Sequence, residues 1–226
     1  MSRRFAVVDV PQRSPEWFAA RCGRLTGTCA RAMLATIQKG EAASRRDLRA
    51  QLVVERLTGI PQDDGYINAA MQRGIDKEAD ALAAYEAFSG CLVQRAGFLA
   101  HGELAAGVSL DGYVGDFHGI VEVKCPKSAT HLNALRSRAV PTEYAPQVLH
   151  GLWMTGASWC DWVSFDDRFP ERLQLLIVRV VRNQFEVMAY ERTVLTFLES
   201  VDREYQEAVG LSVSSALVPA QMHAVT

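Results

Sequence analysis

The segment from Asp111 to Lys124 combines two carboxylates and a lysine at a spacing that could serve metal-dependent hydrolysis. Ten residues separate Asp111 from Glu122, and Lys124 follows in the run Val-Glu-Val-Lys. Residues two positions apart on a strand share one face, so Glu122 and Lys124 are predicted to point the same way. A turn over residues 116–119 would bring Asp111 close to Glu122, where two carboxylates repel each other unless a cation lies between them. The pattern predicts a Mg²⁺-type site, with Lys124 beside it to orient or deprotonate a water molecule.

A second interpretation of these residues stays open at this point. An isolated Glu-x-Lys pair is common on the solvent-facing side of a strand, where it forms an ordinary surface ion pair. The Asp111-Gly112 step upstream is what favours the metal site over that interpretation.

A third carboxylate interrupts the apolar face of a predicted long helix over residues 68–89. Apolar residues recur at helical spacing from Met71 to Tyr85, and Glu78 occupies the missing position in that series. One interpretation is a carboxylate that pairs with a buried arginine or lies at the rim of the core. The other is a carboxylate held inward for a cation or a proton transfer.

The elements that must position these residues are predicted from capping signals and periodicity. Ser14-Pro15 is a typical helix start, and Gly59 and Gly90 are typical helix ends. Helices are expected over residues 14–23, 26–37, 47–58, 68–89, 143–155 and 193–209, and strands over 107–115, 120–125, 172–181 and 185–190, the last two as a hairpin. Strands between helices indicate an α/β or α+β sandwich, with a mobile tail after Gly210.

Composition narrows the class of protein. The chain has 226 residues, of which 49% are hydrophobic, so it can bury a substantial core, and one domain over residues 1–226 is expected. The net charge of −2 disfavours a nucleic-acid binder that uses its whole surface, but it leaves a local basic groove possible. No stretch approaches the roughly 18 apolar residues of a membrane span, so no membrane role is expected. The five cysteines lack a Cys-x-x-Cys pair, which favours a reducing cytoplasm over a disulfide framework or a zinc site.

Four blocks of the sequence, taken in order, resemble the phage lambda-type exonuclease family, also called YqaJ-like viral recombinases, of the PD-(D/E)-x-K nuclease superfamily. They are W-F-A-A-R-C-G-R-L-T-G-T (17–28), R-G-I-D-K-E (73–78), S-L-D-G (109–112) with V-E-V-K-C-P (121–126), and Y-A-P-Q-V-L (144–149). Each block is weak alone, but their order and the E-V-K-C-P run make the set specific. The resemblance implies a restriction-endonuclease-like core, in which helices flank a mixed β-sheet.

The resemblance also implies roles for individual residues. The ligands of a divalent metal, Mg²⁺ or Mn²⁺ and two ions per site, would be Asp111, Glu122, the carbonyl of Val123, and Glu78. Lys124 would position the attacking water, with Gln147 hydrogen-bonding nearby. Arg21, Thr28 and Ser109 match a pocket that grips a terminal 5′-phosphate, for which a guanidinium and hydroxyl donors are suited.

At the level of the whole protein, the resemblance implies a 5′→3′ exonuclease that degrades one strand of double-stranded DNA to mononucleotides. It further implies a homotrimeric ring, a single-strand annealing protein as partner, and a phage or prophage gene expressed in the bacterial cytoplasm. Two alternatives stay open: another PD-(D/E)-x-K nuclease, either single-strand-specific or endonucleolytic, and a non-catalytic module that binds DNA ends.

The chain departs from the family pattern at four positions. Leu110 replaces a proline, Thr28 replaces a serine, Leu149 replaces a second glutamine, and Thr130 stands where a basic residue is expected. Lys127 or His131 could supply the missing cation. The candidate metal ligands therefore match the family pattern more completely than the candidate phosphate-binding residues do.

Overall fold

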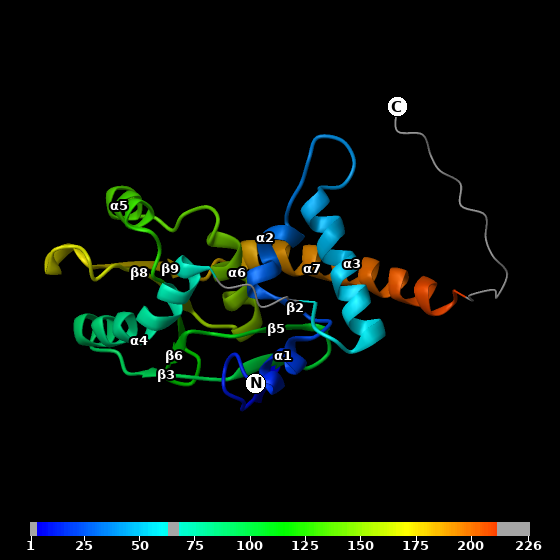
Figure 1. Cartoon of the computed structure of the whole chain (residues 1–226), viewed down its shortest axis with the longest axis horizontal. Coiled ribbons are helices and arrows are strands. Elements are labelled where there is room, and N and C mark those ends of the chain that lie inside the picture. Colours follow the sequence, from blue (N-terminus) through cyan, green and yellow to red (C-terminus); the bar gives the residue numbers. More distant parts are fainter. Residues whose placement is uncertain (1–3, 63–67, 212–226) are drawn as a thin grey trace.

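A computed structural model describes residues 4–62 and 68–211, and Figure 1 shows its elements in chain order. The helices are α1 Pro15–Arg21, α2 Ala30–Met33, α3 Ala43–Thr58, α4 Ala69–Ser89, α5 Ser128–Ser137, α6 Ala145–Thr155 and α7 Gln184–Val209, with 3₁₀ turns η1 Gly27–Cys29 and η2 Glu171–Leu173. The strands are β1 Phe5–Val8, β2 Leu25–Thr26, β3 Val93–Gln94, β4 Phe98–His101, β5 Ala106–Val108, β6 Gly112–Val114, β7 Gly119–Lys124, β8 Trp159–Phe165 and β9 Leu175–Val181. Within the described ranges, no helix is long and apolar enough to cross a bilayer. The expected tail lies, from residue 212 on, outside the described residues.

The strands form two sheets. Four strands pair in the order β1-β4-β5-β2, and five pair in the order β3-β6-β7-β8-β9. β7 runs parallel to β8 and antiparallel to β6, with Gly112 opposite Val121. Continued by one position, this register sets Asp111 opposite Glu122, immediately beyond the last paired residues. Mixed sheets flanked by helices confirm the predicted fold class.

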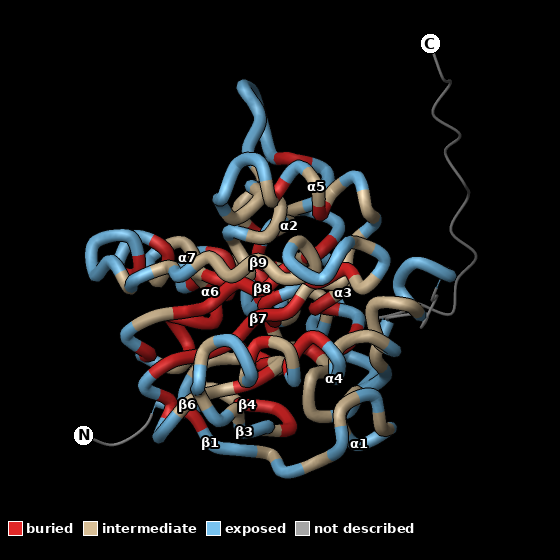
Figure 2. Tube along the Cα trace, turned by 90° about the vertical axis from the view of Figure 1, so that its left-hand side faces the viewer, coloured by how far each residue is buried: buried red, intermediate tan, exposed pale blue. Residues whose placement is uncertain are grey.

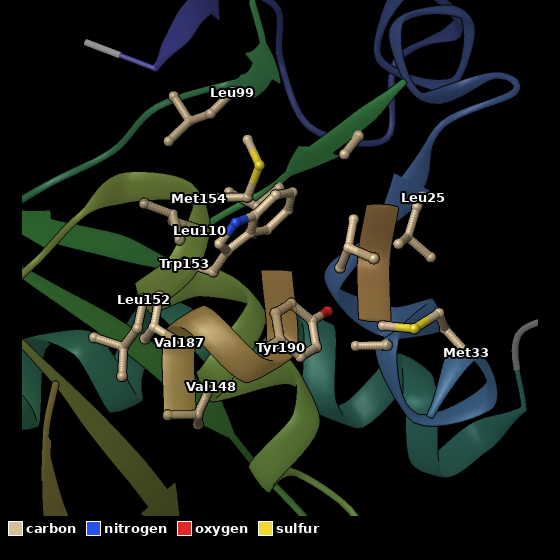
Figure 3. Close-up of a cluster of buried hydrophobic side chains, with 14 of the residues drawn as sticks. Leu25, Met33, Leu99, Leu110, Val148, Leu152, Trp153, Met154, Val187 and Tyr190 are labelled. Atoms are coloured by element: carbon tan, nitrogen blue, oxygen red, sulfur yellow. The ribbon is translucent and has the colours of Figure 1, made fainter. Parts of the chain in front are cut away.

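Side chains of β7 alternate between two cores on opposite faces of the five-stranded sheet. Val121 and Val123 pack with Tyr85 of α4, whereas Ile120 belongs to the larger core under α6 and α7. Figure 2 shows buried residues concentrated along β7 and β8 at the centre of the molecule. Figure 3 shows Trp153 of α6 within the larger core, and α3, which crosses α7 in Figure 1, contributes Leu48, Leu52 and Val53 to the same core. The strand that carries Glu122 and Lys124 is thus held from both sides.

Residues 185–190, predicted as the second strand of a hairpin, lie instead in the first turns of α7. Asn183 caps this helix, because its side chain accepts hydrogen bonds from the next two amides of the first turn at 3.0 and 3.4 Å. Val187, Tyr190 and Val194 are spaced for one helical face and are all buried. The prediction failed because an aromatic and β-branched composition favours a strand locally, whereas burial of a helical face decided the structure. The first strand of the predicted hairpin is present as β9.

Other predicted boundaries also shift. The helix expected over residues 26–37 is the short pair η1 and α2, and the helix expected over 47–58 begins earlier, in α3. The strand expected over 107–115 is two strands in different sheets, β5 and β6. The chain passes from one sheet to the other at residues 109–111, and this break places Ser109 and Asp111 at an opening between sheets.

Gly119 begins the strand that carries the candidate catalytic residues, and it leaves no room for a side chain. A Cβ atom there would lie 2.1 Å from the indole of Trp159 on the adjacent strand. We expect Gly119→Ala to lower the free energy of unfolding by about 1–3 kcal/mol, because the indole or the strand must move. Urea denaturation measures this change. An unchanged unfolding midpoint would mean that the indole moves aside at no cost. Gly102→Ala is the control for glycine replacement without crowding, because Gly102 has no positive φ and the nearest atom to a Cβ there, the carbonyl oxygen of Arg4, lies at 3.5 Å.

Candidate active site

A cleft of about 680 Å³ opens where α1, α4, α6 and the end of β7 meet. Most of the candidate residues line it, and they come from segments far apart in the sequence: Arg21, Thr28, Glu78, Ser109, Asp111, Val123, Lys124 and Gln147. Glu122 lies behind this lining and is only 4% exposed. The structure thus gathers at one place all the side chains that the sequence had grouped into a metal site and a phosphate pocket.

Asp111, Glu122 and Lys124 form a compact buried cluster at the floor of the cleft. Asp111 accepts a hydrogen bond from the amide of Val123 at 2.7 Å through Oδ2. Lys124 Nζ lies 2.5 Å from Glu122 Oε1, so the ammonium is the present counter-charge of that carboxylate. The Glu-x-Lys pair is therefore a partly buried ion pair inside a cleft rather than a solvent-facing surface pair.

The electrostatics of this cluster favour a cation. Burial raises the pKa of Asp111 well above its ordinary value, and the nearby Glu122 charge raises it further, with a smaller contribution from Glu78. For Lys124, burial acts to lower the pKa, but the charges of Glu122 and Asp111 outweigh it and raise the pKa above its ordinary value. A dication beside Asp111 would offset the negative charge of Glu122 and stabilise the ionised form of Asp111.

The donor atoms fit Mg²⁺ or Mn²⁺. The charges of Glu122 and Glu78 both act on Asp111, and hard divalent ions take carboxylate oxygens as ligands. Among the described residues, no three acidic, histidine or cysteine side chains are arranged as a metal-binding cluster. Cationic side chains pair instead with the carboxylates of Glu122 and Glu78. The ligand roles of these residues, and that of the Val123 carbonyl, stay predictions.

Glu78 combines features of both interpretations considered from the sequence. Its side chain lines the cleft and is 12% exposed, and its two oxygens pair with Arg13 Nη2 at 3.3 Å and Arg95 Nη1 at 2.9 Å. Both arginines are about half exposed, so the pairing is not with a buried arginine. Glu78 therefore lies at the rim of the core, paired with two arginines and near enough for its charge to act on Asp111.

Arg21, Thr28 and Ser109, which we call the Arg21 pocket, form one wall of the same cleft. Ser109 Oγ accepts hydrogen bonds from Trp17 Nε1 at 2.9 Å and Arg21 Nη1 at 3.3 Å. The guanidinium carbon of Arg21 lies 4.0 Å from the centre of the Trp17 ring. Thr26 Oγ1 links the pocket further, since it accepts from Arg21 Nη2 at 3.5 Å and lies 3.2 Å from Thr28 Oγ1. Guanidinium and hydroxyl donors that converge on one point suit a phosphate group.

Two members of this network were not assigned roles from the sequence. Trp17 stacks on Arg21, and Thr26 holds the hydroxyl of Thr28, so both fix the donors in place. The available signal was their position inside the block over residues 17–28, the same block that contains Arg21.

The wall formed by α6 supplies Gln147 and a further residue that the sequence reasoning missed. Tyr144 precedes the helix, and its ring centre lies 5.5 Å from Lys124 Nζ. The same ring stacks on the buried Trp162, with ring centres 5.7 Å apart. Tyr144 thus limits the positions open to the Lys124 ammonium, while Gln147 lines the cleft beside it.

The structure distinguishes the two cations considered as substitutes for the basic residue missing at Thr130. His131 is fully buried, and its ring nitrogens are engaged with Ser164 Oγ at 2.7 Å and the carbonyl of Leu173 at 2.8 Å. Lys127 lines the cleft. Lys127 is therefore the cation that can meet a ligand there.

The comparison with known proteins follows this geometry. The family model of the YqaJ-like viral recombinase domain matches residues 16–158. The chain belongs to the YqaJ-like viral recombinase family. The match contains every member of the Arg21 pocket and every candidate metal ligand, and the recognised blocks are those of the family. Among curated protein sequences, no match was found.

Solved structures agree with this family membership. The chain is similar to an alkaline exonuclease, LHK-Exo, from Laribacter hongkongensis, with 36% identity over 87% of this chain and 96% of that one and a TM-score of 0.78. A crystal structure of LHK-Exo in complex with dAMP gives 35% identity, 86% and 96% coverage, and a TM-score of 0.79. A phage-related exonuclease from Haemophilus somnus 129PT, 14% identical over 82% of this chain and 96% of that one with a TM-score of 0.64, shares the fold.

Proposed function

We propose that this recombinase-family protein is a divalent-metal-dependent exonuclease that digests one strand of double-stranded DNA in the 5′→3′ direction from 5′-phosphorylated ends, releasing mononucleotides. The observation that carries the proposal is the convergence of two sites in one cleft. The cluster of Asp111, Glu122 and Lys124 lies beside the Arg21 pocket. The relatives support the same reading, since LHK-Exo is an alkaline exonuclease and has been crystallised with the mononucleotide dAMP.

The chain's own groups account for the parts of a phosphodiester hydrolysis. The Arg21 pocket would hold the terminal 5′-phosphate, and the Asp111 cluster would then meet a neighbouring phosphodiester of the same strand. Lys124 would orient the attacking water or donate to a phosphoryl oxygen, and Gln147 would add a hydrogen bond. Asp111, Glu122, the Val123 carbonyl and Glu78 would hold two Mg²⁺ ions, which when bound supply Lewis-acid stabilisation of the phosphoryl oxygens.

The charge of the cleft suits a DNA strand although the protein as a whole is acidic. Its cationic lining residues are Arg13, Arg21, Lys124 and Lys127, and its acidic ones are Glu78 and Asp111. Phosphate contacts by such residues carry no sequence information. We therefore expect digestion to depend on the chemistry of the DNA end and not on base sequence.

The test of the proposal compares linear duplexes with 5′-phosphate and 5′-hydroxyl ends, with and without Mg²⁺. We expect Mg²⁺-dependent loss of one strand from the phosphorylated ends, about 10²-fold faster than from hydroxyl ends, because a hydroxyl end lacks the charge-assisted hydrogen bonds that a phosphate would make with the Arg21 pocket. Arg21→Ala should reduce this preference toward one. Quantitative gel analysis of end-labelled strands provides the measurement.

Two outcomes would contradict the proposal. Equal attack on both ends by the native protein would leave a nuclease but remove the Arg21 pocket as its phosphate site. Cleavage of covalently closed circles at the rate of linear duplex would favour an endonuclease of the same superfamily. Arg24→Ala, a change at a neighbouring arginine outside the cleft, is the matched control for Arg21→Ala.

We also propose, from family membership, a homotrimeric ring that encircles DNA and cooperation with a single-strand annealing protein during phage-type recombination. Sedimentation velocity at micromolar concentration tests whether the chain forms a trimer. A monomer under conditions of full activity would contradict it.

A further inference from the structure

The turn before α1 reaches over the cleft and contributes side chains that the family match does not include. Gln12 Nε2 donates to the carbonyl of Leu110 at 2.9 Å, directly beside Asp111. Arg13 pairs with Glu78, and both Gln12 and Arg13 line the cleft. The family match begins at residue 16, so no family role is assigned to this turn.

The backbone at Arg13 is unusual. Its φ angle is +69°, in the left-handed region, where among the described non-glycine residues only Phe117 and Arg138 join it. A residue with a Cβ adopts this conformation at a cost that glycine or asparagine largely avoids. The turn retains an arginine where a smaller residue would fit the backbone better. Conformations of this kind persist where the surrounding structure holds them, and they cluster at functional sites.

The need to neutralise the charge of Glu78 does not by itself explain why an arginine occupies position 13. Arg95 already pairs with Glu78 at 2.9 Å, closer than the 3.3 Å of Arg13. Arg95 lines hollows outside the cleft, whereas Arg13 lines the cleft itself. Of the two arginines that hold Glu78, only Arg13 therefore reaches the space where a substrate would lie.

We propose that Arg13 contacts a backbone phosphate of the DNA strand in the cleft, on the Glu78 side of the site. The Arg13 side chain is 44% exposed, so its guanidinium can turn from Glu78 to a phosphate with little desolvation. The fork of donors in a guanidinium binds phosphate oxygens in pairs. The ion pair with Glu78 keeps the side chain at the cleft before DNA arrives. This inference rests on the proposed function, because it takes DNA as the ligand.

The experiment measures DNA binding without catalysis. Binding of 5′-phosphorylated duplex to the full chain is followed by fluorescence anisotropy in EDTA across a range of salt concentrations. Arg13→Asn suits the test because asparagine tolerates a positive φ. We expect the affinity at low salt to fall by roughly tenfold and the slope of log K against log salt to decrease by about one, as for one lost phosphate contact.

Arg95→Asn is the matched control, since it removes the other arginine that pairs with Glu78. It should leave the salt slope unchanged. If Arg13→Asn and Arg95→Asn have the same effect on the slope, Arg13 serves only to hold Glu78 and the inference is wrong. Arg13→Gly, which fits the backbone best, guards against misfolding and must reproduce the asparagine result, with thermal unfolding recorded for each variant.

Failure of this inference is distinguishable from failure of the proposed function. If the native protein digests 5′-phosphorylated duplex but Arg13→Asn binds DNA with the native slope, only the Arg13 contact is removed. If the native protein neither binds nor digests duplex DNA, the proposed function itself is wrong.

Discussion

Replacing Asp111 with asparagine is expected to lower the rate of Mg²⁺-dependent DNA digestion by roughly 10³-fold, because a metal-held reaction centre contributes several kcal/mol to the barrier. Asparagine keeps the shape of the side chain and can still accept the hydrogen bond from the Val123 amide. What it removes is the charge that would hold the cation. Single-turnover digestion of phosphorylated duplex measures the effect.

The same substitution should not destabilise the metal-free protein. Burial and the neighbouring Glu122 charge raise the pKa of Asp111, so the folded state binds its proton more tightly than the unfolded state does. An ionised Asp111 therefore costs stability, and the cost is absent below about pH 4 and grows as the pH rises toward the raised pKa. In EDTA near pH 7, Asp111→Asn should unfold at the same or a higher urea concentration than the native protein.

The control for Asp111→Asn is the same substitution at Asp161, a buried carboxylate that does not line the cleft. Asp161 is 1% exposed and is held by Arg179 at 2.8 Å and by the Tyr85 hydroxyl at 2.7 Å. Asp161→Asn leaves the Arg179 guanidinium without its counter-charge, so stability should fall while the activity per folded molecule is kept. If Asp111→Asn retained native activity, the assignment of the reaction centre would be wrong.

Replacing Lys124 with glutamine is the change with the next largest expected effect. We expect kcat to fall by about 10²–10³-fold with little change in KM, because the ammonium acts on the water or the phosphoryl oxygen in the transition state. Lys124→Arg should not restore the rate. The Nζ atom is held between Glu122 and the ring of Tyr144, and a planar guanidinium cannot take the same position.

The free energy of unfolding provides a second measurement for Lys124→Gln. It is expected to fall, whereas for Asp111→Asn it should stay the same or rise. Glu122 is buried and loses its counter-charge, so the free energy of unfolding in EDTA should fall by about 1–3 kcal/mol. Lys127→Gln changes another lysine of the same cleft and should raise KM more than it lowers kcat. A rate for Lys124→Gln within threefold of the native rate would remove Lys124 from the chemistry.

The parts of the fold that sequence reasoning predicted are those set by local rules. Asn68 caps α4 by accepting hydrogen bonds from two amides at 3.0 Å, and Gly90 ends that helix with a positive φ, as their residue types indicated. The two-residue period of a strand placed Glu122 and Lys124 on one face, and the turn after β6 placed Asp111 opposite Glu122.

The parts that were missed depend on contacts between distant segments. Strand β8 is an inner strand of the five-stranded sheet, between β7 and β9, although Asp161 interrupts its apolar pattern. Only the tertiary partners Arg179 and Tyr85 make a buried charge acceptable there. Residues 183–186 form an Asn-x-x-Glu helix start that the sequence offered as a signal, and Asn183 Oδ1 accepts hydrogen bonds from the amides of Phe185 and Glu186.

By itself, the sequence determined which side chains are available for chemistry and on which face of each element they lie, because residue type, helical period and strand period are local properties. The tertiary structure alone decided that the chain breaks at residues 109–111 to pass between two sheets, and that Ser109 thereby meets Arg21 in the cleft that contains Asp111. It also decided that Arg13 lies over the same cleft, with its backbone in a conformation that its residue type disfavours. These contacts between distant residues depend on how whole sheets and helices pack, and the free energy of that packing is distributed over residues remote from the site.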